Sequence, residues 1–466
     1  MALDGHSSLT INKLLENGIQ KAQEKDSNIL ISMVNKINFY PKNPYLKGQK
    51  FFWKDKSTSI YGFGFVKCIK IGATDDRFKE VSDQWEQIRA NAIIDNPFEE
   101  QAVGPLLFGS LSFDHVHLDN QLWKNFQNGL FYIPEFMITV TENGSFLTIN
   151  IVCTNKSDPL ELTNQLIEKR EKIINCIKKQ TDNYIRLEEM EPKILDDQAD
   201  KWINNVQEAI TLLNDHYLQK VVLAREIRLA FDNDISNEHI IQKLVSEQQD
   251  SYVFALESKE DIFIGASPER LVKKIGTKVF SSCVAGSAKR GSNKDEDNFL
   301  GEQLLNDKKN LAEHQFVVQM ITDAFFKYCD SIKKPNRPDL MKIRDIQHLY
   351  TPVEGRLMDH HTIFDLVSEL HPTPALGGTP KETALSLIRD LELFERGMYA
   401  APIGWVDYRG NGEFVVGIRS GLLQGKEASI FAGCGIVKDS DPQLEYEETN
   451  IKFRPMLRLL GGQLDD

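Results

Sequence analysis

The sequence predicts an α+β fold built from large antiparallel sheets flanked by helices. Short apolar runs of strand length alternate with Gly, Pro and Asn up to residue 153 and again after residue 220. Segments with apolar residues at helical spacing come in blocks between these groups of strands. Strict alternation of strand and helix would indicate a parallel sheet, so the block arrangement favours antiparallel sheets.

The N-terminal part supplies the first group of strands. An amphipathic helix is expected over residues 8–25, and another over residues 77–95. Asn143-Gly144 separates two apolar runs, which is a strong indication of a two-residue hairpin turn. The apolar runs in this part are Ile29–Val34, Ser59–Ile71, Leu106–Phe113, Phe136–Glu142 and Ser145–Cys153.

The rest of the chain continues the same pattern. Residues 156–215 are polar with apolar positions at helical spacing, which predicts one or two helices. After them we expect strands at Val221–Leu229, Tyr252–Glu257, Ile262–Gly265, Lys278–Val284, 343–355 and 403–437, and helices within 298–330, 361–370, 380–396 and 441–460.

Composition and charge exclude several classes of protein. A net charge of −13 over 466 residues argues against a nucleic-acid partner, which needs a basic surface. No apolar stretch reaches the roughly 18 residues of a membrane span, and no basic segment precedes an apolar run at the N-terminus. The six cysteines form no Cys-x-x-Cys pair. We therefore expect a reduced cytoplasmic protein without a structural zinc site.

Four motifs occur in a fixed order in the C-terminal half. They are Lys220-Val-Val-Leu-Ala-Arg225, Gly265-Ala-Ser-Pro-Glu269-Arg-Leu271, His371-Pro-Thr-Pro-Ala375-Leu-Gly-Gly378 and Phe431-Ala-Gly433-Cys-Gly435-Ile-Val437. Together they resemble the chorismate-utilising enzymes, which include isochorismate, salicylate and aminodeoxychorismate synthases and the large subunit of anthranilate synthase. The resemblance is strong over residues 195–460 and loose before them.

The resemblance implies the chorismate-utilising enzyme fold, in which two intertwined subdomains pack large antiparallel sheets as a sandwich. On this basis residues 1–195 form the N-terminal β-rich region of the sandwich. Residues 196–466 form the chorismate-binding catalytic region, intertwined with the first.

Lys220 and Glu269 are the candidate catalytic residues. Taken alone, Lys220 is more often a solvent-exposed lysine at a strand edge, and Glu269 is as often a surface partner of Arg270. The resemblance implies that Lys220 is the general base acting on a water and Glu269 the general acid. A lysine that acts as a base must lose its proton, which burial or neighbouring cations promote.

Acidic residues on two predicted helices are candidate metal ligands. Glu313 interrupts an apolar helical stripe, and Glu445, Glu448 and Lys452 share one face of a helix that begins at Asp441-Pro442. Without context these acids would be a solvated acidic surface. The resemblance implies that Glu313 and Glu448 bind Mg²⁺, with Glu445 in a supporting role, because this cation prefers carboxylates and keeps water and substrate ligands.

The remaining candidates are expected to bind the substrate. Arg419 is expected on the second strand of a hairpin turned at Arg409–Gly412, where a guanidinium suits a carboxylate. Alone, such an arginine is more often a surface residue, and a lone histidine such as His348 is usually structural. The substrate-binding residues that the resemblance implies are Gly286, Ser287, His348, Ala375, Tyr399, Arg419, Gly433 and Lys452.

Two residues indicate which reaction to expect. Isochorismate and salicylate synthases carry lysine at the position of Lys220, whereas anthranilate synthases usually do not. Salicylate synthases usually carry threonine at the position of Ala375, where isochorismate synthases have alanine. The resemblance therefore implies a Mg²⁺-dependent, reversible isochorismate synthase, an isomerase in which water attacks C2 of chorismate and the C4 hydroxyl leaves.

The longer N-terminal region, with Phe108–Asp114 and Trp123–Pro134, resembles the menaquinone type. The alternatives are a siderophore-pathway isochorismate synthase, a salicylate synthase and, in a different class, a regulatory protein that binds chorismate without catalysis. The last would be expected to lack Lys220, Glu269 or a metal glutamate, and all are present. Chorismate is the expected small-molecule partner; we expect no glutaminase subunit, and a monomer or weak dimer.

Overall fold

The computed structural model describes residues 8–46, 48–116, 121–179, 191–196, 198–213, 218–342 and 346–463. Within these ranges the chain forms two large sheets, of 13 and 10 strands, with helices on their outer faces. Apart from the short β1–β5 pair, the pairings between the described strands are antiparallel. The predicted α+β class with large antiparallel sheets is confirmed.

The first sheet contains strands from both parts of the chain, because β12 pairs with β2. The short strand β19 (Gly378–Thr379) pairs with the beginning of β11. In spatial order the other strands are β10 (Lys193–Asp196), β11 (Lys220–Ala230), β23 (Glu427–Ile436), β22 (Ser420–Gln424), β13 (Asp261–Ser267), β12 (Tyr252–Ser258), β2 (Gln49–Lys54), β3 (Ser59–Phe63), β8 (Phe136–Thr141), β9 (Gly144–Cys153), β1 (Ile29–Ile37) and β5 (Ile93–Asp95).

The second sheet also joins early and late segments, because β6 pairs with β20. The short strand β17 (Asp339–Lys342) pairs with β18. In spatial order the other strands are β16 (Cys329–Lys333), β18 (Ile346–Leu357), β15 (Lys278–Lys289), β14 (Arg270–Ile275), β21 (Gly412–Val416), β20 (Pro402–Asp407), β6 (Leu106–Leu111), β7 (Gly129–Ile133) and β4 (Lys67–Ile71).

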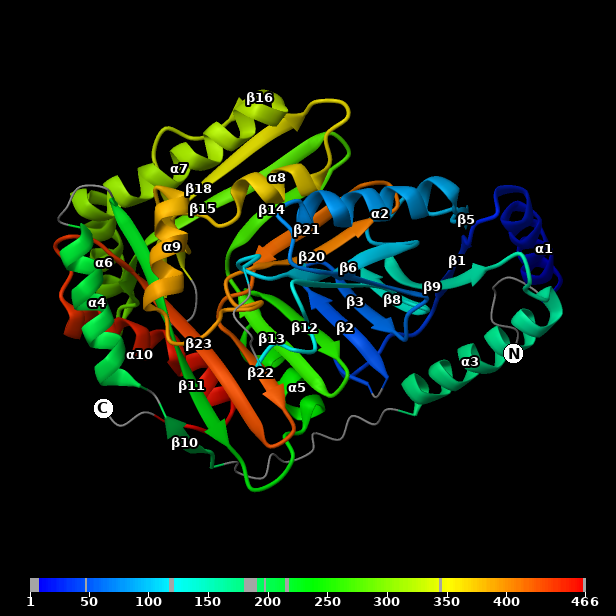
Figure 1. Ribbon diagram of the computed structural model, residues 1–466, viewed down its shortest axis with the longest axis horizontal. Coiled ribbons are helices and arrows are strands. Elements are labelled where there is room, and N and C mark those ends of the chain that lie inside the picture. The colour runs from blue at the N-terminus through cyan, green and yellow to red at the C-terminus, as the bar shows by residue number, and fades with distance from the viewer. Residues whose placement is uncertain are drawn as a thin grey trace.

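Helices cover the outer faces of both sheets. The second sheet carries α2 (Arg77–Asn91), α6 (Lys294–Asn306), α7 (Lys308–Tyr328) and α8 (Ile363–Leu370). The first carries α1 (Ser8–Lys25), α3 (Pro159–Lys178), α4 (Ala199–Leu213), α5 (Asn237–Glu247) and α10 (Pro442–Leu459), while α9 (Lys381–Leu391) lies beside β11. Helices α1 and α3 lie at the opposite end of the molecule from α4 and α9 (Figure 1). In the described part of the chain, no helix combines the length and hydropathy that a membrane crossing requires.

Side-chain alternation along β2 shows how the first sheet contributes to two cores. Phe51 and Trp53 belong to the core that includes the second sheet, where the Phe51 ring stacks on Phe108 of β6 with centroids 4.3 Å apart. Phe52 belongs to the core under α1, α3 and α5 and contacts Tyr61. Burial on both faces fixes the strand register, because a slip of one residue would exchange the two sets of side chains.

Most predicted elements are present, with ends shifted by a few residues. Asn143-Gly144 lies in the turn between β8 and β9, as predicted. The prediction of one continuous run over Ser59–Ile71 is wrong, because β3 and β4 belong to different sheets. Gly64, with a φ of +56°, lies in the turn between them and adopts a conformation that favours glycine. Residues 343–345 of predicted strand 343–355, and residues 180–190, 197 and 214–217 of segment 156–215, lie outside the described residues.

Candidate active site

A cavity of about 260 Å³ lies between β11, β15, β18, β23, α7 and α10. It is lined by every site residue predicted from the sequence except Glu445. The predicted residues that line it are Lys220, Glu269, Gly286, Ser287, Glu313, His348, Ala375, Tyr399, Arg419, Gly433, Glu448 and Lys452. These residues span half of the chain, so the cavity depends on long-range strand pairing.

Lys220 begins β11, and its side chain crosses the backbone of the neighbouring strand β23. A Cβ on Gly435 would lie 2.5 Å from Lys220 Cε, so only glycine leaves the lysine this path. The Lys220 side chain is 13% exposed and forms an ion pair with Glu313 on α7. The strand therefore holds the lysine nitrogen inside the cavity beside a carboxylate.

Glu269 lies in the short connection between β13 and β14, directly after Ser267-Pro268. Burial raises the pKa of Glu269 to about 7, although the positive charges of Arg419 and Lys220 lower it. A carboxyl group with such a pKa carries a proton over much of the neutral range. It can therefore donate a proton to a group in the cavity.

Glu313 on α7 and Glu448 on α10 bring two carboxylates to the same cavity. Each is paired with a lysine: Glu313 with Lys220, and Glu448 with Lys452 Nζ at 2.7 Å. Within the described residues no group of three or more His, Cys, Asp and Glu side chains is placed to hold a metal. Two carboxylates fit Mg²⁺, which commonly takes one or two of them and fills its other positions with water and substrate oxygens.

Glu445 does not line the cavity, although it shares a helix with Glu448. Its carboxylate accepts a hydrogen bond from Ser440 Oγ at 2.7 Å, and its backbone oxygen lies 3.6 Å from Cys434 Sγ. The N-cap predicted for this helix is present, because Asp441 Oδ1 accepts from the backbone N–H groups of Gln443 and Leu444. Glu445 therefore contacts the segment that enters α10.

Arg419 lies in the cavity, but not on a strand as predicted. It follows β21 and precedes β22, with a φ of +49°, in the left-handed region that few side chains other than glycine adopt. Ala266 N–H of β13 donates to Arg419 O at 3.1 Å, next to the Gly265–Ser420 pair at which β22 begins, while Ile418 N–H donates to Val416 O at 2.8 Å. The expected strand ends at Val416, and a turn directs the guanidinium.

Tyr399 and Lys452 add hydrogen-bond donors to the same cavity. Tyr399 is buried, and its ring stacks on Phe431 with centroids 5.3 Å apart. Burial raises the pKa of Tyr399 well above its ordinary value, so its hydroxyl keeps its proton. Burial alone would lower the pKa of Lys452, but the Glu448 carboxylate more than offsets this and raises it. Lys452 Nζ also donates to Gly433 O at 2.9 Å.

His348 is a neutral imidazole that faces the cavity. Burial, together with the positive charges of Arg419 and Lys452, lowers its pKa to about 3. Its Nδ1 lies 2.7 Å from Ser287 Oγ, and its buried Nε2 has no hydrogen-bond partner among the described residues. A bulge in β15 between Val284 and Ser287 aligns Ser287 with His348 on β18. The ring can therefore offer Nε2 to a ligand.

Arg396 and Glu392 also belong to the site, and the sequence analysis missed them. Arg396 lines the cavity, and its side chain and that of Glu392 are each 3% exposed. Arg396 Nε donates to Glu392 Oε2 at 2.9 Å. Their i, i+4 spacing is the available signal in the sequence. Such spacing is common on exposed helices, so it does not reveal a buried pair.

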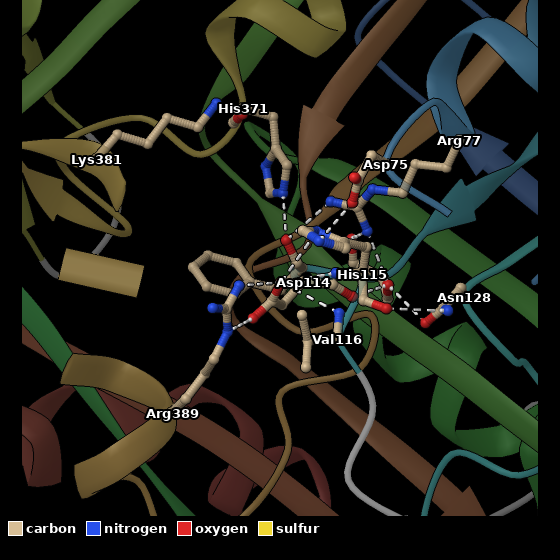
Figure 2. Close-up of polar contacts among 11 residues, drawn as sticks. Asp75, Arg77, Asp114, His115, Val116, Asn128, His371, Lys381 and Arg389 are labelled. Atoms are coloured by element: carbon tan, nitrogen blue, oxygen red, sulfur yellow. Dashed lines mark hydrogen bonds and ion pairs between the residues drawn. The ribbon is translucent and has the colours of Figure 1, made fainter. Parts of the chain in front are cut away.

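The loop that contains Ala375 is anchored at its start, His371. Figure 2 shows His371 between the segment after β6 and Lys381 of α9. The ring Nε2 lies 2.8 Å from Phe113 O, and Lys381 Nζ donates to His371 O at 2.5 Å. The same segment is held by Arg77 of α2, which donates to Ser112 O at 2.6 Å. These contacts fix one side of the cavity wall.

Comparison with known proteins gives consistent matches along the whole chain. Residues 16–461 match the family model of the chorismate binding enzymes. The chain is 41% identical to isochorismate synthase MenF of Bacillus subtilis, over 97% of this chain and 98% of that protein. It is 32% identical to the salicylate biosynthesis isochorismate synthase of Pseudomonas aeruginosa, over 89% of this chain and 86% of that protein.

A solved structure supports the fold assignment. The menaquinone-specific isochorismate synthase MenF from Escherichia coli superposes with a TM-score of 0.74, covering 97% of this chain and 100% of that one, at 21% sequence identity. At this identity the likeness concerns the fold. Together with the family match over nearly the whole length, these findings show that the chain belongs to the chorismate binding enzymes.

Proposed function

We propose that this protein is an isochorismate synthase that interconverts chorismate and isochorismate. One observation carries the proposal: Lys220 and a Glu269 carboxyl group with a pKa of about 7 line the same small cavity as several cationic side chains. A hydroxyl exchange on a ring needs a base for the entering water and an acid for the leaving hydroxyl. The names of the Bacillus and Pseudomonas relatives support the same activity.

In the proposed reaction, Lys220 removes a proton from a water molecule that attacks C2 of chorismate. The ring double bonds shift, and the bond between C4 and its hydroxyl oxygen breaks. Glu269 donates its proton to that oxygen, which leaves as water. One water enters and one leaves, so the product is an isomer of the substrate. Substrate and product carry similar bonds, and we therefore propose that the reaction is reversible.

The substrate is a dianion, and we propose that cationic and hydroxyl groups of the cavity orient it. Arg419, Tyr399 and Lys452 would bind its carboxylates through charge-assisted hydrogen bonds. Glu313 and Glu448 would hold Mg²⁺, whose charge would offset the ring carboxylate. The neutral His348 would donate or accept one hydrogen bond through Nε2. Held in this way, the ring lies between base and acid, which lowers the entropic part of the barrier.

Ala375 supports isochorismate as the released product. Its side chain has no hydroxyl group, whereas salicylate synthases, which also eliminate pyruvate, usually carry threonine there. We propose that the product feeds menaquinone biosynthesis, because the match to the Bacillus MenF protein is higher and longer than that to the Pseudomonas salicylate-pathway protein. We further propose that the enzyme acts in the cytoplasm, uses water without a glutaminase subunit, and is a monomer or weak dimer.

The identity of the product is the first test. Purified protein incubated with chorismate and Mg²⁺, without ammonium, should form isochorismate. The final ratio of isochorismate to chorismate should be the same when isochorismate is the starting compound. NMR and mass spectrometry distinguish the products. Salicylate and pyruvate as the main products would instead indicate that the protein is a salicylate synthase. Anthranilate formed on addition of ammonium would contradict the assignment of water as nucleophile.

Metal removal tests the two carboxylates. EDTA-treated protein should lose activity and regain it with Mg²⁺. Glu313→Gln and Glu448→Gln should each raise the Mg²⁺ concentration for half-maximal activity by roughly tenfold or more, because each removes one charged ligand. Glu445→Gln is the matched control, since Glu445 lies on α10 outside the cavity, and it should change this concentration least. Full activity in metal-free buffer would contradict the proposal.

The pH dependence tests Glu269. Its carboxyl group is protonated below a pKa of about 7 and charged above it. An acid catalyst works only while protonated, so kcat/KM should decrease above that pH, by about tenfold per pH unit in the limit. Glu269→Gln, which cannot donate a proton, should lose roughly 10²-fold or more in kcat at all pH values. A wild-type profile that stays flat between pH 6 and 9 would exclude Glu269 as the acid.

A further inference from the structure

Strand β11 has a gap along one of its two edges. Its other edge pairs with β23 from Val221 to Ala230. On the gapped edge, β19 pairs only with Lys220 and Val221, and β10 pairs only with residues 228–230. Between them, the backbone groups of Val222 and Ala224 point away from β23 and are buried. Buried backbone groups need hydrogen-bond partners, so something other than a strand must supply them.

The backbone carbonyl of Gly377 accepts from Val222 N–H at 2.8 Å, and side chains supply the other partners. Arg396 Nη2 donates to Val222 O at 2.7 Å, and Glu392 Oε1 accepts from Ala224 N–H at 2.7 Å. Trp202 Nε1 donates to Ala224 O at 3.1 Å. The Glu392–Arg396 pair therefore takes the place of a neighbouring strand directly after the two residues that pair with β19.

The same guanidinium also reaches the loop that contains Ala375. Arg396 Nη1 donates to Leu376 O at 2.7 Å, one residue after Ala375. The face of the guanidinium lies 4.2 Å from the centroid of the Phe113 ring. Phe113 in turn is part of the segment that holds His371 at the start of this loop. Arg396 thus joins the strand of Lys220 to the loop of Ala375.

From these contacts we propose that Glu392 and Arg396 are positioning residues that fix the Lys220 strand relative to the Ala375 loop. The proposal rests on the proposed function, because it assigns them to the alignment of the base. Arginine has five N–H donors in a planar fork. Four of them are directed at protein atoms here, because Nη2 also donates to Glu392 Oε1 in addition to the three contacts above. A lysine has one nitrogen and cannot contact Glu392, Val222 and Leu376 in this geometry.

Kinetics of conservative variants test the proposal. Arg396→Lys and Glu392→Gln keep a similar volume, so both should fold. Arg396→Lys should lower kcat by roughly 10²-fold, the loss that a small misplacement of a catalytic group can cause. KM should change by less than about threefold, because Arg419, Tyr399 and Lys452 remain to bind the substrate. The kcat of the double variant should be no lower than that of Arg396→Lys, because the effects of substitutions at residues that act as a unit do not add.

Arg389→Lys is the matched control, on α9 a few residues before this pair. Arg389 pairs with Asp114 at 2.5 Å, as Figure 2 shows. It does not line the cavity. This variant should keep the wild-type kcat and KM. If Arg396→Lys keeps the wild-type kcat, or raises KM with kcat unchanged, the positioning role is wrong, and the second result would make Arg396 a substrate ligand.

A measurement without substrate separates this inference from the proposed function. Backbone hydrogen exchange at Ala224 should be faster in folded Arg396→Lys than in the wild type, because Glu392 is no longer held in place as its acceptor. Arg389→Lys should exchange at the wild-type rate. If the wild-type protein forms no isochorismate, the proposed function is refuted. The exchange rate at Ala224 would still show whether Arg396 holds Glu392 in place as the acceptor of the Ala224 N–H. Unchanged exchange at Ala224 in Arg396→Lys would overturn the inference.

Discussion

The pairing of β11 with β23 is the constraint on which the candidate site depends. Its register places Val222 opposite Gly435, so that the Lys220 side chain passes over a residue without a Cβ. The same register brings Gly433 to the cavity wall, where its carbonyl accepts from Lys452. A slip of one residue would bury other side chains and turn Lys220 away from Glu313. One ladder of hydrogen bonds therefore places Lys220, the proposed base, and the Gly433 carbonyl that contacts Lys452.

Charge placement gives the cavity its chemistry. The chain carries a net charge of −13, yet Lys220, Arg419 and Lys452 face the space that would hold an anion. Two of these cations pair with Glu313 and Glu448, the carboxylates that are proposed to hold Mg²⁺. Glu269 differs from these carboxylates, because burial dominates its environment and keeps its proton near neutral pH. The proposed acid and ligand roles thus rest on burial and pairing, not on residue type.

Local signals in the sequence were sufficient for much of the fold. Asn143-Gly144 predicts its hairpin, and Asp441-Pro442 predicts the start of α10, because both depend on the conformation of a few adjacent residues. Most of the cavity residues followed from the family resemblance. The left-handed turn at Arg419 and the buried Glu392–Arg396 pair could not be predicted, because each depends on segments distant in sequence. For the same reason the sequence did not reveal that Glu445 bonds to Ser440 and lies outside the cavity.

The origin of the oxygen atom in the product tests the proposed chemistry most directly. Mass spectrometry can locate the label in isochorismate formed from unlabelled chorismate in ¹⁸O-labelled water. If Lys220 activates a water for attack at C2, the first turnovers should introduce one labelled oxygen, in the C2 hydroxyl. Lys220→Ala should form the same labelled product roughly 10²–10⁴-fold more slowly. Isochorismate that forms without label would mean that the hydroxyl moves within the substrate, and would contradict a mechanism with Lys220 as base and Glu269 as acid.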